Sequence, residues 1–216
     1  MSNILSTEHL CLECRACEQI CSKHAISMQE NAEGFSYPKI DMDICVDCGL
    51  CVKVCPAINA DDIKNKSCDV YAAQLKDKAI LKKSSSGGVF SLIAEHVINS
   101  GGIVFGAAWD EHLQLRHIGV ESIDALQKLR GSKYVHSNIG NTFVQARDNL
   151  KTGRLVYFTG TPCQIAGLKL FLRKDYTNLI TSDLVCHGTP SQKLFNLFVK
   201  GMEKDRNVRL IDRVSS

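Results

Sequence analysis

A cysteine motif that occurs twice is the feature that most constrains what this chain can fold into. The first copy reads CLECRACEQIC and the second reads CVDCGLCVKVCP. Each cysteine of the first copy returns 34 positions later, because Cys45 stands where Cys11 stood (45 minus 11). The C-x2-C-x2-C-x3-C spacing is typical of proteins that hold two 4Fe-4S cubanes. Two cubanes in one short segment indicate electron transfer.

The same spacing predicts which thiolate binds which cubane. Three closely spaced cysteines fit around one cube, and the fourth, on the helix that follows, binds the other cube. We therefore assign one cluster to Cys11, Cys14, Cys17 and Cys55, and the second to Cys45, Cys48, Cys51 and Cys21.

Zinc and disulfides are the simpler readings of so many cysteines. Structural zinc usually takes two separated CxxC pairs around a single ion, which is not the pattern of this chain. Disulfides fit poorly because the total of eleven cysteines is odd and Met1–Leu10 has no secretory character. We therefore expect a reducing, cytoplasmic setting. Ser22 stands where a proline often follows the fourth cysteine, whereas Pro56 keeps that place in the second copy.

Charge and hydropathy exclude two classes of partner. Net charge is +3, from 26 basic and 23 acidic residues, without the basic stripe of a nucleic-acid binder. The longest apolar run, Gly102–Trp109, is far shorter than the roughly 18 residues of a membrane span and predicts a buried strand. We expect neither nucleic-acid binding nor a membrane span.

Two domains of different kinds are expected. Residues 1–62 form an α+β, ferredoxin-like cluster domain, in which a hairpin of Ala25–Met28 and Phe35–Ile40 covers the clusters. A polar linker follows at Asp61–Ser67. Residues 69–216 alternate strands with helices, which is typical of an α/β domain with a largely parallel sheet.

The elements of the second domain follow from the spacing of apolar residues. Strands are predicted at Val70–Leu75, Ile103–Trp109, Leu113–Val120, Leu155–Phe158 and Leu179–Cys186. Helices are predicted at Gly88–Asn99, Ile123–Leu129, Thr142–Leu150, Pro162–Arg173 and Pro190–Met202.

A second internal repeat marks the ends of two strands. Gly160–Gln164 reads GTPCQ and Gly188–Gln192 reads GTPSQ. In each, threonine suits the N-cap, proline the first helical position, and glutamine a capping box. Both turns should lie at the carboxyl edge of the sheet, where ligands of α/β sheets bind.

Cys163 and Cys186 stand beside these two turns. If the strands are neighbours, both thiols face one crevice, and the helix dipole should favour the Cys163 thiolate. Small buried core cysteines are the alternative reading. The Ser84–Gly88 loop (SSSGG), ahead of a helix, permits close approach of a phosphate, although it lacks both GxGxxG and the P-loop lysine.

Four ordered blocks together resemble a known family. They read SSSGGVFSLIAEHVINSGGIVFGAAWD, LRGSKYVHSNIG, GTPCQIAGL and DLVCHGTPS. The chain resembles the family of beta subunits of coenzyme F-420-reducing hydrogenases and dehydrogenases, whose members are iron–sulfur flavoproteins. The resemblance implies FAD, bound near Ser86, Gly87, Gly88, Gly131, Ser132, Lys133, Tyr134 and Thr161, with Lys133 suited to a phosphate or a reduced-flavin anion.

The same resemblance implies a further cluster site that this sequence carries only in part. Family cysteines matching Cys163 and Cys186 help to bind an additional 4Fe-4S cluster, with partners from a downstream CxxC pair. No such pair follows Cys186, so we expect the α/β domain to be shortened at its C-terminal end. The two thiols would then be free, joined in a redox-active disulfide, or half of an incomplete site.

Two functions fit these sequence features. The first is an iron–sulfur flavoprotein oxidoreductase that relays electrons through two clusters to FAD and a small-molecule acceptor or donor. The second is a non-catalytic electron-transfer subunit that binds a partner oxidoreductase and holds no flavin. Both imply a redox partner protein or subunit, and no catalytic residue is singled out.

Overall fold

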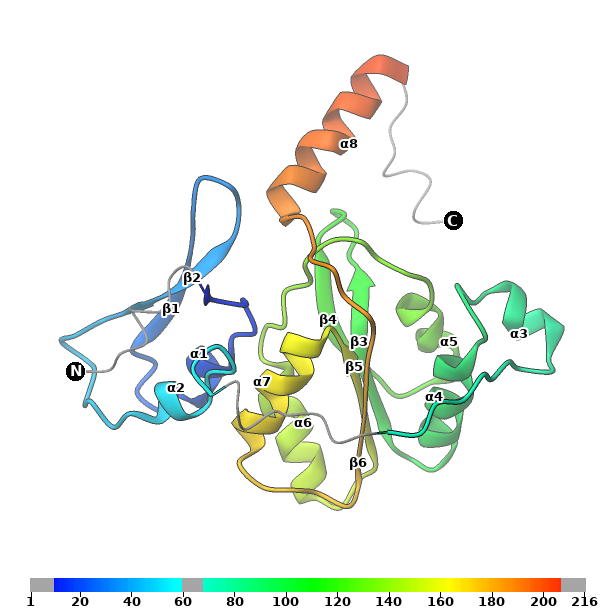
Figure 1. The fold of residues 1–216 in the computed structure, drawn as a ribbon, viewed down its shortest axis with the longest axis horizontal. Coiled ribbons are helices and arrows are strands. Elements are labelled where there is room, and N and C mark those ends of the chain that lie inside the picture. Colours follow the sequence, from blue (N-terminus) through cyan, green and yellow to red (C-terminus); the bar gives the residue numbers. More distant parts are fainter. Residues whose placement is uncertain (1–9, 60–67, 207–216) are drawn as a thin grey trace.

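The computed structural model describes residues 10–59 and 68–206 (Figure 1). The N-terminal segment contains two short helices, α1 (Ala16–Ile20) and α2 (Leu50–Lys53), and two strands, β1 (Ile26–Glu30) and β2 (Ser36–Ile40). The strands pair antiparallel around a turn in which Asn31 Oδ1 accepts hydrogen bonds from Glu33 N and Phe35 N. The predicted hairpin is thus confirmed.

The cysteine repeat is also a repeat of backbone conformation. Glu13 and Asp47, which are 34 positions apart, have φ of 51° and 50°. Arg15 and Gly49, the next matched pair, have φ of 56° and 69° and immediately precede α1 and α2. Left-handed residues on both sides of the second cysteine make each loop curl back before its helix begins.

A four-stranded sheet forms the centre of the second part of the chain. Its order is β4 (Leu115–Val120), β3 (Ile103–Trp109), β5 (Val156–Gly160) and β6 (Leu179–Asp183). β3, β5 and β6 run parallel, whereas β4 is an antiparallel edge strand paired with β3. The sheet is mixed and mostly parallel, as expected for an α/β domain.

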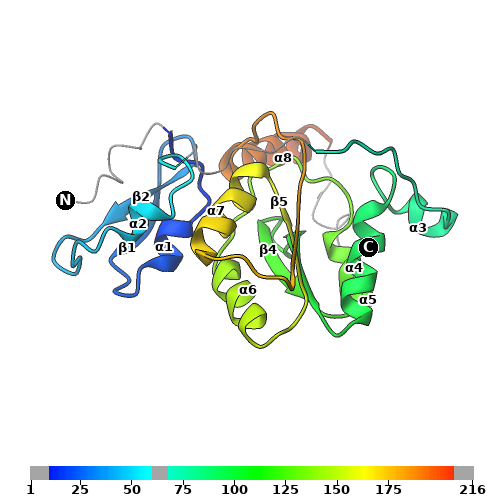
Figure 2. The ribbon, with the colours of Figure 1, turned by 60° about the horizontal axis from the view of Figure 1, so that its bottom comes forward.

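Helices cover both faces of the sheet, as Figures 1 and 2 show. One face carries α4 (Val89–Asn99), α5 (Ile123–Leu126) and the 3-10 helix η3 (Gln127–Leu129). The other carries α6 (Thr142–Lys151) and α7 (Pro162–Leu172). The short α3 (Lys78–Lys82) precedes α4, and α8 (Gln192–Arg206) projects beyond the end of the sheet.

The hydrophobic core on the α6–α7 face continues into the N-terminal segment. Phe143, Phe158 and Leu168 pack there together with Cys14 and Val54. The opposite face has a separate core beneath α4 and α5. The cluster segment therefore packs on the α/β domain through a shared apolar interior.

One predicted strand is absent and another is shorter than predicted. Residues 70–75 form no strand, and Val70 and Tyr71 are 91% and 81% exposed. The sheet consists of β4, β3, β5 and β6, and residues 70–75 pair with none of them. The strand predicted over Leu179–Cys186 ends at Asp183.

The second GTPxQ turn does not cap its helix as predicted. α8 begins at Gln192, and Ser191 accepts the hydrogen bonds of its first turn at Oγ from Leu194 N and at its carbonyl from Phe195 N. The Gln192 side chain instead bonds the backbone of Leu113 and Leu115. A tertiary contact has replaced the local capping box.

The predicted linker at 61–67 lies outside the described residues. Within the described part of the chain, no helix is both long and apolar enough to cross a membrane.

Candidate functional site

Four cysteines from the two motifs line one small cavity in the N-terminal segment. They are Cys11, Cys14, Cys17 and Cys55, the same four that the spacing groups around one cluster. Met28 and Pro38, which face each other across the hairpin, complete its wall. The hairpin therefore forms part of the cavity wall, in which Cys14 and Cys17 are buried and Cys11 and Cys55 are partly exposed.

The burial of these thiols decides what they are able to bind. Burial raises the pKa of the Cys14 thiol to about 12, and the neighbouring Cys55 and Cys11 add to this effect. Burial likewise raises the pKa of Cys17. Thiols in such a place become thiolates only when a positively charged centre compensates them. Among the described residues no three His, Cys, Asp or Glu side chains converge on a position for a single metal ion. The four thiols line one cavity, and the spacing of their motifs predicts a cluster as the compensating centre.

Three cysteines of the second set pack beside Cys17 of the first set. Cys21, Cys45 and Cys51 pack with Cys17, Ile26 and Ile40 in one apolar cluster. Ile26 and Ile40 are paired across the hairpin, so one face of the hairpin covers both sets. Cys48, the fourth member, is exposed on the loop before α2. Its ligation, like that of the other seven, stays a prediction.

α7 connects the first cysteine set to the sheet. A Cβ added at Gly167 would lie 2.9 Å from Cys14 Cβ and 3.0 Å from Cys14 Sγ, so only glycine allows this close approach. The helix begins with the predicted capping box, since Thr161 N donates to Gln164 Oε1 at 3.0 Å and Pro162 is the first helical residue. Cys163 stands in that first turn.

Cys163 and Cys186 lie beside the ends of neighbouring strands, and Cys186 acts electrostatically on Cys163. β5 and β6 are adjacent, parallel strands, which confirms the premise on which the predicted crevice rests. Burial raises the pKa of Cys163, and Cys186 raises it further, whereas a contact with Thr161 Oγ1 at 3.1 Å lowers it. The expected preference for the thiolate is wrong for the protein described here, because desolvation outweighs the helix N-terminus. Both thiols are free.

The predicted flavin residues comprise two loops that meet and Thr161, the N-cap residue of α7. Ser132 N donates to Ser85 Oγ at 2.8 Å, which joins the SSSGG loop to the segment Gly131–Tyr134. Tyr134 is 80% exposed. Lys133 Nζ donates to the carbonyl oxygens of three residues, Leu129, Arg130 and Gly131. No hydrogen bond among the described residues links Thr161 to either loop.

These facts bear on how well the two loops fit FAD. The loops offer backbone amides, hydroxyls and an exposed aromatic ring, which are suitable partners for a flavin nucleotide. Partial burial lowers the pKa of Lys133 to about 8, and its ammonium group faces inward to carbonyls. The donor set fits the cofactor, although Lys133 is positioned as a support of the loop.

Close packing against neighbouring backbone requires glycine at position 87, and the sequence alone did not show this contact. A Cβ at this position would lie 2.3 Å from the carbonyl oxygen of Ala73, and Leu75 N donates to Gly87 O at 2.8 Å. The extended segment 72–75 therefore occupies the space beside the glycine. A bulky residue there would displace backbone, so Gly87→Leu does not test flavin binding cleanly.

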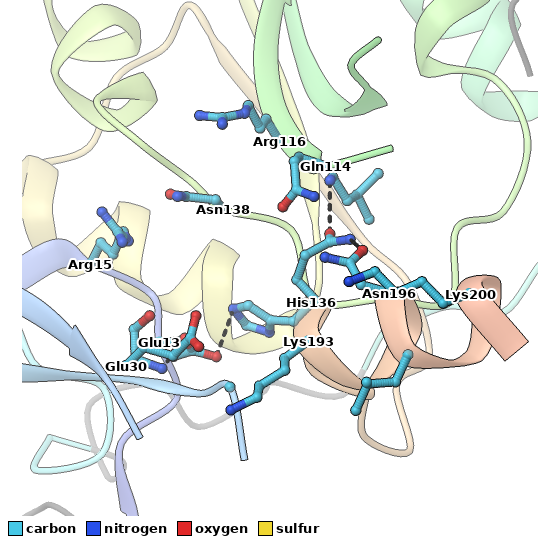
Figure 3. A pocket seen from close by; sticks show the side chains of 15 residues that line it. Glu13, Arg15, Glu30, Gln114, Arg116, His136, Asn138, Lys193, Asn196 and Lys200 are labelled. Carbon is cyan, nitrogen blue, oxygen red and sulfur yellow. Dashed lines mark hydrogen bonds and ion pairs between the residues drawn. The ribbon is translucent and has the colours of Figure 1, made fainter. Parts of the chain in front are cut away.

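A polar cleft that sequence reasoning missed lies between the cluster segment and the α/β domain (Figure 3). Its walls come from the first cysteine loop, the hairpin, the start of β4, the segment around His136, and α8. The one local signal was the spacing of Lys193, Asn196 and Lys200, which repeats at three and four residues and places them on one face of a helix.

Comparisons with known proteins divide the chain in the same way. Residues 10–59 match the model of a 4Fe-4S dicluster domain. Residues 70–142 match the N-terminal model, and residues 153–214 the C-terminal model, of the coenzyme F420 hydrogenase/dehydrogenase beta subunit. The eight cysteines of the dicluster match imply two 4Fe-4S clusters.

Two curated proteins are similar to parts of the chain. One of the subunits of the F(420)H(2) dehydrogenase of Methanosarcina mazei is 25% identical over 173 residues, which cover 74% of this chain and 48% of that protein. Ferredoxin-type protein NapF of Haemophilus influenzae is 38% identical over 55 residues, or 24% of this chain and 31% of that protein. The chain thus spans about half the length of the first relative and a smaller share of the second.

Proposed function

The chain belongs to the family of coenzyme F420 hydrogenase/dehydrogenase beta subunits, with a 4Fe-4S dicluster segment in front, and from this membership we propose that it relays electrons between a partner protein and FAD. Its family is one of oxidoreductase subunits, and its dicluster segment is of the electron-transfer type. We propose, beyond the family membership, that the chain binds FAD and exchanges electrons with a small-molecule acceptor or donor. We also propose that its two domains are residues 1–62 and 69–216.

One observation carries the proposal more than any other. Cys14, a predicted ligand of the first cluster, packs directly on Gly167 of α7, and the same helix begins at the carboxyl edge of the sheet. When bound, the two clusters supply one-electron transfer and FAD supplies the exchange between one-electron and two-electron chemistry. The chain itself holds the first cysteine set against the domain that would bind the flavin and excludes water between them.

The flavin is the point on which the two candidate functions differ. We expect protein purified and reconstituted without oxygen to contain about eight iron atoms per chain and bound FAD. Iron is measured chemically and flavin by its absorbance after release. Eight iron atoms without flavin would support the alternative, an electron-transfer subunit that holds no flavin.

The position of the flavin is tested with two exposed aromatic rings. Tyr134→Ala should weaken FAD binding, because Tyr134 lies beside the two loops that meet through Ser132 and Ser85. Phe198→Ala removes an exposed ring from α8, which belongs to neither loop, and serves as the control. If both variants bind FAD as the unaltered protein does, the site is not at these loops.

A further inference from the structure

The cleft of Figure 3 has a volume of about 430 Å³, which is in the size range of small-molecule sites. None of the predicted flavin residues lines it. Its walls are formed by residues distant in sequence, so its existence depends on how the cluster segment, β4 and α8 are held together.

Contacts at the start of α8 hold this helix to the hairpin and to the start of β4. Ser191 Oγ donates to Glu33 O at 2.6 Å and Lys193 Nζ donates to Ala32 O at 2.9 Å, which attaches the helix to the hairpin turn. On the other side, Gln192 bonds the start of β4, and Phe195 stacks on Trp109 with 4.9 Å between ring centroids. The cleft is therefore preformed.

The charges around the cleft are unequal. Four of its side chains are cationic, Arg15, Arg116, Lys193 and Lys200, and two are acidic, Glu13 and Glu30. Glu13 is already engaged, because it accepts a hydrogen bond from Ser36 N and lies 3.7 Å from His136 Nε2.

The basic wall is only partly neutralised. Arg15 and Arg116 pair with Glu18 and Asp110, which lie outside the cleft. Among the described residues, neither Lys193 nor Lys200 forms an ion pair with a carboxylate. Gln114, Asn138 and Asn196 add amide groups, and all three are labelled among the lining side chains in Figure 3. Positive charge together with amides is suited to carboxylate or phosphate oxygens.

We propose that this cleft binds an anionic organic molecule that bears phosphate or carboxylate groups. The site lies beside the first cysteine loop, since Arg15 lines both the cleft and the cysteine cavity. The bound molecule would thus contact the residue next to Cys14. The inference stands on the geometry of the cleft and does not depend on flavin binding.

Calorimetric titration of the reconstituted protein tests the proposal with four probes. They are adenosine 5′-monophosphate, adenosine, glutarate and inorganic phosphate. We expect adenosine 5′-monophosphate or glutarate to bind and adenosine to bind much more weakly, with affinity falling as salt increases. The first two separate phosphate from carboxylate recognition, and inorganic phosphate shows whether the anion alone suffices. Equal affinity for adenosine and its monophosphate, or no binding of any anionic probe, would overturn the proposal.

Two variants locate the binding. Arg116→Gln combined with Lys200→Gln should weaken binding of the anionic probe about tenfold or more, because two charged contacts are lost. Lys169→Gln, on the exposed side of α7 and outside the cleft, changes the charge without touching the site and should leave the affinity unchanged. A double variant that binds as tightly as Lys169→Gln would place the anion elsewhere.

Discussion

Left-handed backbone at Glu13, Arg15 and Asp47 is the most unusual local conformation of the two cysteine loops. An L-residue in this region costs roughly 1–2 kcal/mol relative to its preferred conformations. Gly49 takes the place of Arg15 in the second copy and adopts the same region without that cost. The path of the loop is therefore set by the need to bring three cysteines together and is kept with or without glycine.

Asp47 allows this strain to be tested, because its side chain is exposed on the second loop. Asp47→Gly should retain iron better than Asp47→Val, since glycine adopts positive φ freely and both variants lose the carboxylate. Asp47→Val should weaken cluster retention by about 1–2 kcal/mol, because a β-branched residue strongly disfavours this region. Iron content and the rate at which visible absorbance is lost measure the difference. Equal retention in the two variants would show that the backbone there is not strained.

His117 is a buried histidine that holds three parts of the sheet edge together. Its Nε2 lies 2.9 Å from Thr159 O and its Nδ1 lies 2.9 Å from Ser137 Oγ, so the neutral ring donates to the carbonyl and accepts from the hydroxyl. Ser137 in turn accepts from Gln164 Nε2 at 3.0 Å. Through this chain of bonds the capping glutamine of α7 is tied to β4.

The burial of His117 predicts a pH dependence of stability. Desolvation lowers its pKa to about 4, whereas the ring titrates near 6.5 in an unfolded chain. The unfolded state therefore binds a proton that the folded state refuses between these values. The stabilisation is complete above about pH 6.5 and is lost as pH falls towards 4, by about 3 kcal/mol in all.

The measurement is the free energy of unfolding in urea between about pH 5 and pH 7.5, compared with His117→Gln. The variant has no titrating ring, so the difference between the two proteins should shrink as pH falls. Acid effects on the clusters are common to both proteins and cancel. A difference independent of pH would mean that His117 has the same pKa in the folded and unfolded states.

At the scale of elements, specific contacts account for the start of α7, its buried face and its packing against Cys14. Its N-terminus is closed by the Thr161–Gln164 capping box, and its buried face includes Leu168 and Phe171. Gly167 lies on that face at the point where Cys14 approaches. The helix therefore carries the contact between the cysteine cavity and the sheet.

Gly167→Ala tests this contact. The added methyl group would overlap Cys14, so we expect a loss of about 1–3 kcal/mol in stability and a lower iron content. Gly201→Ala is the matched control, because Gly201 lies within α8 with no atom near its would-be Cβ and should gain up to about 1 kcal/mol. If the two substitutions have the same effect, the approach of Cys14 to α7 does not depend on glycine.

Helices and strands that depend mainly on local patterns of residues were predictable from the sequence. The hairpin, β3, α6 and the first GTPxQ cap were predicted because periodicity and capping act within a few residues. Val70–Leu75 has a strand-like composition but pairs with none of the four strands, and Gln192 bonds the start of β4 instead of capping its own helix. The second error arises where a distant part of the chain overrides a local preference.

At the scale of the whole molecule, the decisive contacts join residues more than a hundred positions apart. Gln19 of α1 accepts hydrogen bonds from Phe143 N and Val144 N, at 3.0 and 3.3 Å, in the first turn of α6. Ser191 and Lys193 reach the hairpin turn in the same way. No pattern of spacing reports such bonds, and for this reason the cleft they enclose could not be foreseen from the sequence.

Gln19 acts as a cap for a helix to which it does not belong, and this makes the docking of the two parts testable. α6 has no side-chain cap from its own N-cap residue Asn141, so its first amides depend on Gln19 Oε1. Gln19 Nε2 is buried and has no hydrogen-bond partner among the described residues. Gln19→Glu keeps an acceptor, removes the unpartnered donor and places negative charge at a helix N-terminus, which is favourable by about 0.3–1 kcal/mol.

Gln19→Lys does the opposite, because an ammonium group accepts no hydrogen bond and its charge opposes the helix dipole. We expect it to weaken the docking of the cluster segment by about 1–3 kcal/mol, the cost of leaving buried amides unsatisfied. Thermal unfolding followed both by the visible absorbance of the clusters and by far-ultraviolet circular dichroism should show one shared transition in the unaltered protein and in Gln19→Glu. In Gln19→Lys the cluster absorbance should be lost first, at a lower temperature. Coincident transitions at an unchanged temperature in all three proteins would show that the shared apolar core alone holds the two parts together.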